Sequence, residues 1–322
     1  MPDEASSDAR STSQTIGLLL GPVLFCVILF LDLDSSRPEV TNMAAVAVLM
    51  ATWWITDAIP LSGTALLPLV LYPLLGIMKT RECAPIYVNS TIFLFVGGFM
   101  IAVTMEKWRL HKRIALWIIR RIGGGPSRII LGFMVAAAFL SMWISNTATS
   151  VMMVPIGMAI ISHLKDDPST EKDENLLFGK MLMLAIAYSA SIGGVATLIG
   201  TPPNLVLAGI LEEMYAIEIT FSQWIVIGLP ICIILLFIAW WYLTRVAFEL
   251  KMNSFPGGKG EIRKQLNALG KMSYEERSIL IVFACTALAW ITRSFVLQKF
   301  LPAIDDTIIA VIAGVVLFLS LI

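Results

Sequence analysis

The chain has 322 residues, of which 57% are hydrophobic and 14% are charged, and its mean hydropathy is +0.83. Ordinary soluble domains contain roughly 45–50% apolar and about 25% charged residues, so the composition excludes a soluble domain and predicts an all-α polytopic membrane protein. The formal net charge of zero says little about partners, because the position of each charge matters more in a membrane chain. We expect membrane lipid and small ions, not nucleic acid, as partners.

Residues 1–14 are polar and nearly free of basic residues, as expected of a cytoplasmic tail and unlike the start of a secretory signal. The first apolar run, 16–31, is therefore predicted to be a retained helix. The cysteines lie far apart without CxxC spacing, which favours small hydrophobic residues over a metal or disulfide framework. They are Cys26, Cys83, Cys232 and Cys285.

Apolar runs separated by charged turns predict membrane-spanning helices, since each run is close to the roughly 20 residues that a crossing needs. The runs cover residues 16–31, 43–59, 61–78, 88–106, 222–244, 277–294 and 307–322. We expect Arg293, at the end of one run, to extend its charge along the helix to the membrane boundary.

Basic residues cluster in segments that fall on alternate sides of the predicted spans. The segments 107–128 and 245–277 are the richest, and further lysines follow in 165–180. All three lie on the cytoplasmic side if the N-terminus is cytoplasmic, so the positive-inside rule favours that orientation. The segment 107–128 is predicted to be a basic helix lying in the membrane interface.

The apolar stretch 129–162 is too long for one crossing and too short for two. It would span about 51 Å as a single helix, whereas two crossings need about 40 residues. Its flanks, Arg128 and Lys165, are both expected on the cytoplasmic side. We therefore predict a re-entrant helical hairpin whose tip is Ser145, Asn146 and Thr147.

A second long stretch, 176–210, has a basic flank on one side only and is predicted to cross once. Its centre, 189–204, contains three glycines and the pair Pro202-Pro203, which do not support a continuous helix. We predict two half-helices joined by unwound chain. Irregular backbone at membrane depth is tolerated only where protein covers it or it lines a cavity, so both breaks should face one polar site.

Such breaks can bind two kinds of ion. Free carbonyl, hydroxyl or amide oxygens bind a small hard cation, and half-helix N-termini or side-chain donors bind an anion. The predicted Na⁺ ligands are Ser141, Ser145, Asn146, Gly200 and Thr201. The predicted substrate-binding residues are Asn146, Thr147, Ser145 and Thr201. No Lys or Arg lies between Arg128 and Lys165, so a bound anion would be neutralised by cotransported cations or helix dipoles. This pattern favours coupled transport without another cofactor.

Three segments resemble the divalent anion/sodium symporter family, which carries dicarboxylates, citrate or sulfate. They are "FLFVGGFMIAVTMEKWRLHKRIAL" (93–116), "LSMWISNTATSVMMVPI" (140–156) and "ASIGGVATLIGTPPN" (190–204). The resemblance implies an inverted repeat of about eleven spans and a homodimer in which each protomer moves a transport domain against a scaffold. It also implies that the Ser-Asn-Thr tip and the broken helix form one Na⁺ site and half of the substrate site.

The resemblance also implies a division of the chain. Residues 15–106 would be scaffold-type spans, 222–249 the last span of the first repeat, 250–276 a cytoplasmic linker and 277–322 the start of the second repeat. The family pattern has a second Ser-Asn-Thr hairpin, and here the motif occurs once. Because the sequence ends inside an apolar run, we expect the chain to be a portion that lacks the second half-site.

The resulting hypothesis is sodium-coupled symport of di- or tricarboxylates, of the succinate, malate, fumarate and citrate class, across a plasma or inner membrane. The alternative is a sodium-independent exchanger of dicarboxylate or sulfate with the same fold. An enzyme is not predicted, because His111 and His163 both lie beside charged turns. A channel is disfavoured because no short filter repeat is present. For Ser145 and Thr147 the competing structural interpretation is packing, with hydroxyls bonded to the preceding turn. The small residues of 189–204 could likewise serve close helix packing.

Overall fold

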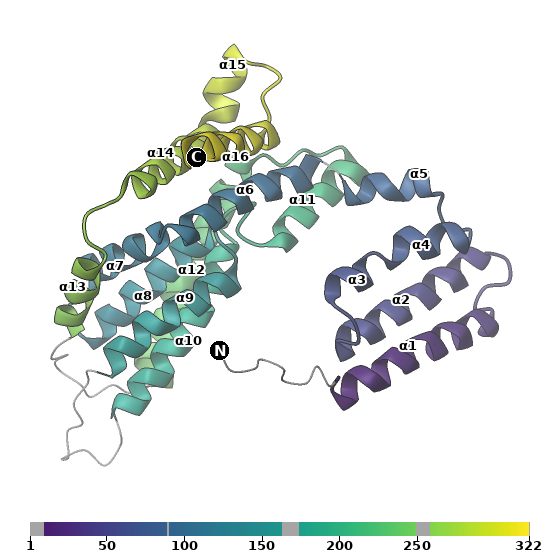
Figure 1. The fold of residues 1–322 in the computed structure, drawn as a ribbon, viewed down its shortest axis with the longest axis horizontal. Coiled ribbons are helices and arrows are strands. Elements are labelled where there is room, and N and C mark those ends of the chain that lie inside the picture. Colours follow the sequence, from purple (N-terminus) through teal and green to yellow (C-terminus); the bar gives the residue numbers. More distant parts are fainter. Residues whose placement is uncertain (1–9, 89, 163–173, 249–257, 322) are drawn as a thin grey trace, which may run out of the picture. The chain divides into compact units, whose positions relative to one another are not determined.

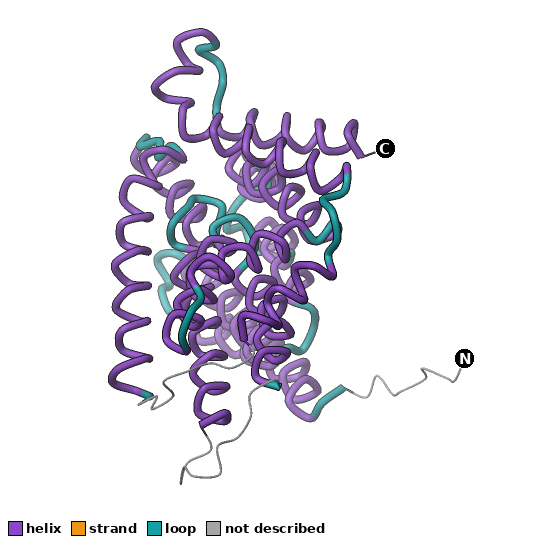
Figure 2. The backbone as a smooth tube through the Cα atoms, turned by 90° about the vertical axis from the view of Figure 1, so that its left-hand side faces the viewer, coloured by secondary structure: helices purple, strands orange, loops and turns teal. Residues whose placement is uncertain are grey.

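The computed structural model describes residues 10–88, 90–162, 174–248 and 258–321. Over these ranges the regular structure is helical and includes no strand (Figure 2), in agreement with the predicted all-α class. The chain divides into two compact units, residues 1–89 and 90–322. The predicted tail 1–14 and linker 250–276 lie partly, and His163 wholly, outside the described residues.

Five helical segments of the described chain are long and apolar enough to cross a membrane. They are Thr12–Leu31, Thr80–Lys107, Leu176–Gly194, Phe221–Ala247 and Tyr274–Phe300. Four shorter apolar helical segments accompany them: Leu61–Leu74, Pro126–Ser141, Asn146–Ile161 and Asp306–Ser320. The run expected over 43–59 is also helical, but it is not among the five.

The first unit is built on two long helices, α1 (Thr12–Leu31) and α2 (Pro38–Thr56) (Figure 1). They pack closely, because two glycines of α1 face side chains of α2. A methyl group on Gly17 would overlap Thr56 Oγ1, and one on Gly21 would lie 2.6 Å from Trp53 Nε1. This contact explains why α1 needs residues without side chains on one face.

The span expected over 61–78 is instead two short helices, α3 (Leu61–Ala65) and α4 (Leu67–Leu74). Pro68 explains the interruption, because proline has no N–H and its ring clashes with the carbonyl four residues earlier in a helix. The unit ends with α5 (Thr80–Cys83) and a 3₁₀ turn over Ala84–Tyr87.

The second unit contains the remaining helices of the described chain. They are α6 (Ser90–Lys107), α7 (Leu110–Ile122), α8 (Pro126–Ser141), α9 (Asn146–Ile161), α10 (Glu174–Gly194), α11 (Pro202–Tyr215), α12 (Phe221–Tyr242), α13 (Gly258–Ala268), α14 (Tyr274–Thr292), α15 (Gln298–Phe300) and α16 (Asp306–Leu321). Two π-helical turns, Leu243–Ala247 and Arg293–Leu297, extend α12 and α14.

Two apolar clusters hold these helices together. One joins α7, α8, α9 and α10, and the other joins α6, α14 and α16 with the start of α11. Glycines again permit close approach: a methyl group on Gly193 of α10 would overlap the Ala138 backbone of α8, and one on Gly97 of α6 would lie 2.6 Å from the Ala310 backbone of α16.

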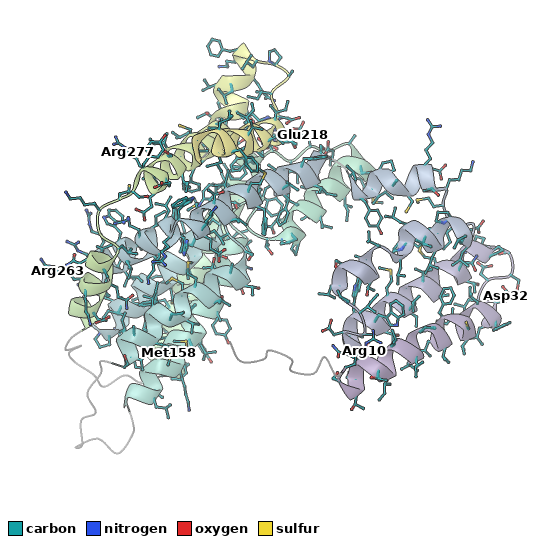
Figure 3. The ribbon with its side chains drawn as sticks, viewed as in Figure 1. Arg10, Asp32, Met158, Glu218, Arg263 and Arg277 are labelled. Carbon is teal, nitrogen blue, oxygen red and sulfur yellow. The ribbon has the colours of Figure 1, made fainter. Side chains whose placement is uncertain are left out.

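Figure 3 shows Arg263 on α13 and Arg277 on α14 well separated from Glu218 within this unit.

The segment predicted as an interfacial basic helix contains α7, which is amphipathic. Its buried face includes Leu116 and Ile119, while Arg120 and Arg121 lie in its last turn. His111 is also buried on this helix, where its Nδ1 lies 2.8 Å from the Met105 carbonyl oxygen. Burial lowers the pKa of His111 below its ordinary value, so the imidazole is neutral at pH 7.

Candidate functional site: a helical hairpin against an interrupted helix

The tip of the α8–α9 hairpin is held by hydrogen bonds between its polar side chains. Ser141 Oγ, buried at the end of α8, donates to Asn146 Oδ1 at 2.6 Å. Ser145 caps α9, and its Oγ accepts from the Ala148 N–H at 3.2 Å. Ser145 and Thr147 are exposed, and Asn146 is half-buried. The turn that connects α8 and α9 therefore has an ordered polar lining.

The interruption between α10 and α11 is held by side chains that satisfy its carbonyl groups. Asn204 Nδ2 donates to the carbonyl oxygens of Gly194 at 2.9 Å and Thr197 at 2.8 Å. Trp224 Nε1, from α12, donates to the Val195 carbonyl at 2.9 Å. Since buried carbonyls need partners, these donors explain how the chain can leave the helix at Gly194 and resume it at Pro202.

The predicted unwound region, 189–204, is longer than the observed one, 195–201. Residues 189–194 complete α10, and Asn204 already belongs to α11. Small side chains allow α10 to continue while it packs closely against α8. Pro202 and Pro203 occupy the first turn of α11, where a missing N–H costs nothing.

The hairpin tip and the interruption are in direct contact. A methyl group on Gly194 would overlap the Oδ1 of Asn146, so the amide of Asn146 lies against the end of α10. A methyl group on Gly200 would in turn contact the Gly194 backbone. The Thr197 hydroxyl donates to the Met142 carbonyl in the turn that follows α8. Two segments separated by about fifty residues thus share one polar contact region.

The structure brings together some of the predicted site residues and leaves others at its edge. Asn146 and Gly200 both lie against Gly194, and Ser141 joins this contact region through its hydrogen bond to Asn146. In the described part of the chain, the Thr147 side chain donates no hydrogen bond, and the Thr201 side chain does not cap α11. Ser145 contributes an exposed hydroxyl at the rim.

The helix ends at this site have opposite electrostatic character. The carboxyl ends of α8 and α10 converge here, and a helix C-terminus carries partial negative charge that favours a cation. The amino end of α9 carries partial positive charge, and its first N–H groups, at Asn146 and Thr147, suit a carboxylate. The amino end of α11 begins with two prolines and so offers no such donors. The interruption is better suited to a cation, and the hairpin tip to an anion beside it.

Residues that support the site were not all predicted from the sequence. Thr197, Asn204 and Trp224 hold the interruption, yet only the Gly-Thr-Pro-Pro-Asn pattern around Asn204 gave a signal. Thr149, in the first turn of α9, is fully buried and its Oγ1 has no hydrogen-bond partner in the described structure. A hydroxyl among apolar residues is too common a feature to single out from sequence.

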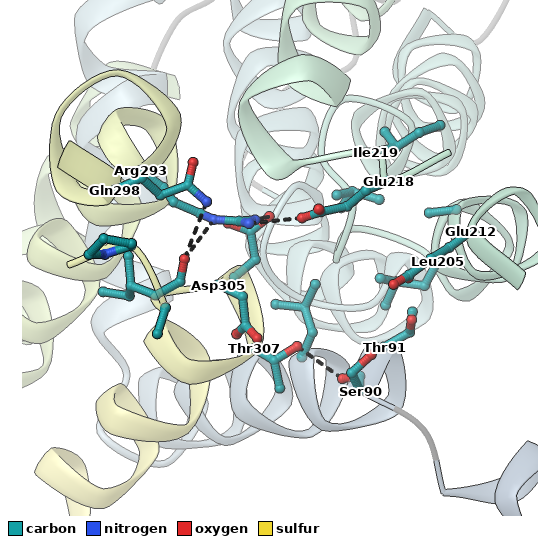
Figure 4. A pocket seen from close by; sticks show the side chains of 17 residues that line it. Ser90, Thr91, Leu205, Glu212, Glu218, Ile219, Arg293, Gln298, Asp305 and Thr307 are labelled. Carbon is teal, nitrogen blue, oxygen red and sulfur yellow. Dashed lines mark hydrogen bonds and ion pairs between the residues drawn. The ribbon is translucent and has the colours of Figure 1, made fainter. Parts of the chain in front are cut away.

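Arg293 does not extend its charge along the outside of its helix as expected. It is only 4% exposed and lies in a polar pocket with Glu218 and Asp306 (Figure 4). The prediction was wrong because acidic partners come from the α11–α12 connection and from the start of α16, which the local sequence around Arg293 does not reveal. A buried guanidinium requires such compensation.

Comparison with known proteins gives a consistent result. A family model described as the sodium:sulfate symporter transmembrane region matches residues 12–322. A sodium-dependent dicarboxylate transporter, SdcS, of Staphylococcus saprophyticus is 44% identical over 322 residues, covering 98% of this chain and 62% of the relative. SdcS of Staphylococcus aureus strain MRSA252 is 45% identical over 314 residues, covering 96% and 60%. The chain therefore spans about three fifths of the length of these relatives.

Proposed function

The chain belongs to the sodium:sulfate symporter transmembrane-region family, and from this premise we propose that the complete protein is a secondary active transporter. It couples Na⁺ movement to symport of a di- or tricarboxylate by alternating access. Relatives of 44–45% identity carry the name of sodium-dependent dicarboxylate transporters, which favours a dicarboxylate over sulfate as cargo.

The observation that carries the proposal is the contact between Asn146 at the hairpin tip and Gly194 at the helix interruption. This region gathers hydroxyl, amide and carbonyl oxygens, which are the ligands of a small hard cation. Ser141, Ser145, Asn146, Gly200 and Thr201 would supply oxygen ligands to Na⁺. A cation bound there would neutralise part of the charge of a carboxylate that contacts Asn146 and Thr147.

The membrane arrangement is part of the same proposal. Helices α8 and α9 have 16 residues each, about 24 Å, which is shorter than the roughly 30 Å hydrocarbon core. This length supports a re-entrant hairpin, which we propose enters from the cytoplasmic side because its flanks are basic. We propose a cytoplasmic N-terminus from the distribution of basic residues along the sequence. The inverted repeat and the homodimer are proposed from the family resemblance.

A flux measurement tests the function. The complete protein is reconstituted in liposomes, and uptake of labelled succinate is followed with an inward Na⁺ gradient and with choline in its place. We expect uptake to depend on the Na⁺ gradient. Uptake that ignores Na⁺ but responds to internal dicarboxylate would replace symport by exchange, and preferential uptake of sulfate would change the assigned cargo.

Substitution of Asn146 by alanine removes the amide that connects the hairpin tip to the interrupted helix. We expect Asn146→Ala to lower Na⁺-dependent uptake by roughly ten- to a hundredfold, because the amide that the buried Ser141 hydroxyl contacts is lost at the proposed cation and carboxylate site. The matched control is Asn267→Ala, an exposed asparagine of α13, which should transport like the wild type. Wild-type uptake by a well-folded Asn146→Ala variant would remove Asn146 from the site.

A further inference from the structure

A buried arginine connects three segments of the second unit. Arg293, in the π-helical turn after α14, donates from Nη1 to Asp306 Oδ2 at 3.0 Å and from Nη2 to Glu218 Oε1 at 2.8 Å. Its Nε donates to the Ile304 carbonyl at 3.2 Å. Figure 4 shows Arg293 reaching Glu218 across the pocket. The α11–α12 connection is thereby tied to α14 and to the start of α16.

The two ion pairs differ in how firmly they are held. Asp306 is 5% exposed, its Oδ2 also accepts from the Phe221 N–H at 2.8 Å, and its carbonyl accepts from Trp290 Nε1 at 2.9 Å. The Glu218 side chain is 59% exposed, and among the described residues it pairs with Arg293 alone. Exposed carboxylates gain little from pairing, and buried ones cannot readily leave. The Glu218–Arg293 ion pair can therefore break while the Asp306–Arg293 ion pair stays formed.

The Glu218–Arg293 ion pair lies at a pocket that extends to the interrupted helix. The pocket has a volume of about 330 Å³, and its lining includes Glu218 and Ile219 of the α11–α12 connection. Leu198, from the unwound segment, and Leu205, from α11, also line it. Both leucines are buried, at 1% and 6% exposure. The lining of this pocket thus includes Leu198, which is two residues before Gly200, a proposed cation ligand.

The pocket itself is unsuited to the anionic cargo. Four carboxylate side chains line it, from Glu212, Glu218, Asp305 and Asp306, against the single guanidinium of Arg293. Arg293 is already neutralised by Asp306. A dicarboxylate would be repelled, so a second substrate site does not account for the buried arginine.

We propose that the Glu218–Arg293 ion pair is a latch that holds the α11–α12 connection closed over this pocket, and that its opening exposes the unwound segment during the transport cycle. The role in the cycle rests on the proposed function, whereas the latch itself rests on the geometry. Arg293 and Asp306 form the fixed half, and Glu218 is the moving half.

Thiol labelling of a buried residue that lines the pocket tests the latch independently of transport. In the complete protein, with the four cysteines of this chain replaced by alanine, Leu198→Cys is introduced and its reaction rate with a maleimide is measured in detergent. A pair of this exposure shifts an opening equilibrium by about two- to fivefold. We expect Glu218→Ala to accelerate labelling of Leu198→Cys by that factor. Leu205→Cys provides a second reporter if the first substitution impairs folding.

Glu213→Ala is the matched control, because Glu213 is an exposed carboxylate near the end of α11, five residues before Glu218, without an ion pair in the described structure. It should leave the labelling rate unchanged. The latch is refuted by equal labelling rates with and without Glu218, and equally by the same acceleration in Glu213→Ala. Loss of Na⁺-dependent uptake in the parent protein would overturn the proposed function but would not change the labelling result.

Discussion

Gly194 is the position at which the end of α10 contacts the tip of the hairpin. Its missing side chain leaves room for the Asn146 amide, and the missing side chain of Gly200 leaves room for the backbone of Gly194. The φ angle of Gly194 is not in the left-handed region, so its role is space and not backbone conformation. Glycine is therefore required here for steric reasons, because a larger residue would displace the Asn146 amide at the proposed site.

Gly194→Ala should separate the hairpin tip from the interruption. The added methyl group overlaps Asn146 Oδ1, and a displacement of a few tenths of an ångström or more moves a cation ligand out of place. We expect the Na⁺ concentration for half-maximal uptake to rise about tenfold or more. Uptake at varied Na⁺ measures this, with thermal unfolding as a check of folding.

The control for this substitution is Gly209→Ala on α11. The nearest atom to a methyl group there is Thr91 Oγ1 at 3.7 Å, an ordinary contact. This variant should keep wild-type Na⁺ dependence and should gain slightly in stability, since alanine favours the helix. An unchanged Na⁺ dependence in Gly194→Ala would mean that Asn146 can move aside without loss of the cation site.

At the scale of helices, the sequence predicted the interruptions better than the packing around them. Both breaks were predicted from polar or helix-breaking residues inside apolar stretches of unusual length, a local property of the chain. The division of 61–78 into α3 and α4 was not predicted, although Pro68 was visible, because a proline in an apolar run can also be accommodated as a kink. The buried state of Arg293 depends on Glu218 and Asp306, which are far from it in sequence.

The interruption between α10 and α11 depends on one asparagine more than on its glycines. Asn204 is 7% exposed, and its amide nitrogen serves the carbonyls of both Gly194 and Thr197. Asn204→Leu would remove both donors and leave two carbonyl groups without these partners. An unsatisfied buried group costs about 1–3 kcal/mol, so we expect a lower unfolding temperature together with weaker Na⁺ dependence of uptake.

Asn42 provides the comparison for Asn204. Its Nδ2 donates to the Leu75 carbonyl at 2.8 Å within the first unit, so Asn42→Leu removes a similar bond far along the chain from the cation site. That variant should lose stability while the Na⁺ dependence of the remaining transport stays unchanged. Equal changes in Na⁺ dependence for both variants would show that general destabilisation, and not the geometry of the interruption, accounts for the effect.

At the scale of the whole molecule, the hairpin turn connects the two apolar clusters of the second unit. Trp143, which follows α8, packs against both clusters. Its ring lies 4.8 Å from that of Phe283 in an edge-on arrangement and stacks near Trp290 at 6.5 Å. Both aromatic partners belong to α14. A ligand that fixes the hairpin tip should therefore stabilise packing well beyond the residues that it touches.

Sodium should accordingly raise the unfolding temperature of the complete protein. A ligand present at a hundred times its Kd stabilises the folded state by about 2.7 kcal/mol, which corresponds to a few degrees for a chain of this size. We expect that shift when Na⁺ replaces choline at constant ionic strength. Ser141→Ala should abolish most of it, because Ser141 Oγ is a predicted cation ligand and positions Asn146 through its 2.6 Å hydrogen bond.

Ser189→Ala is the appropriate comparison, because Ser189 is also fully buried and donates only to carbonyls of its own helix, Ala185 at 2.6 Å and Ile186 at 3.1 Å. Both alanine variants lose a buried hydroxyl, so both should unfold at a lower temperature in choline. Only Ser141→Ala should lose the difference between Na⁺ and choline. If the two variants respond to Na⁺ alike, the cation binds elsewhere, and the convergence of the α8 and α10 carboxyl ends serves packing alone.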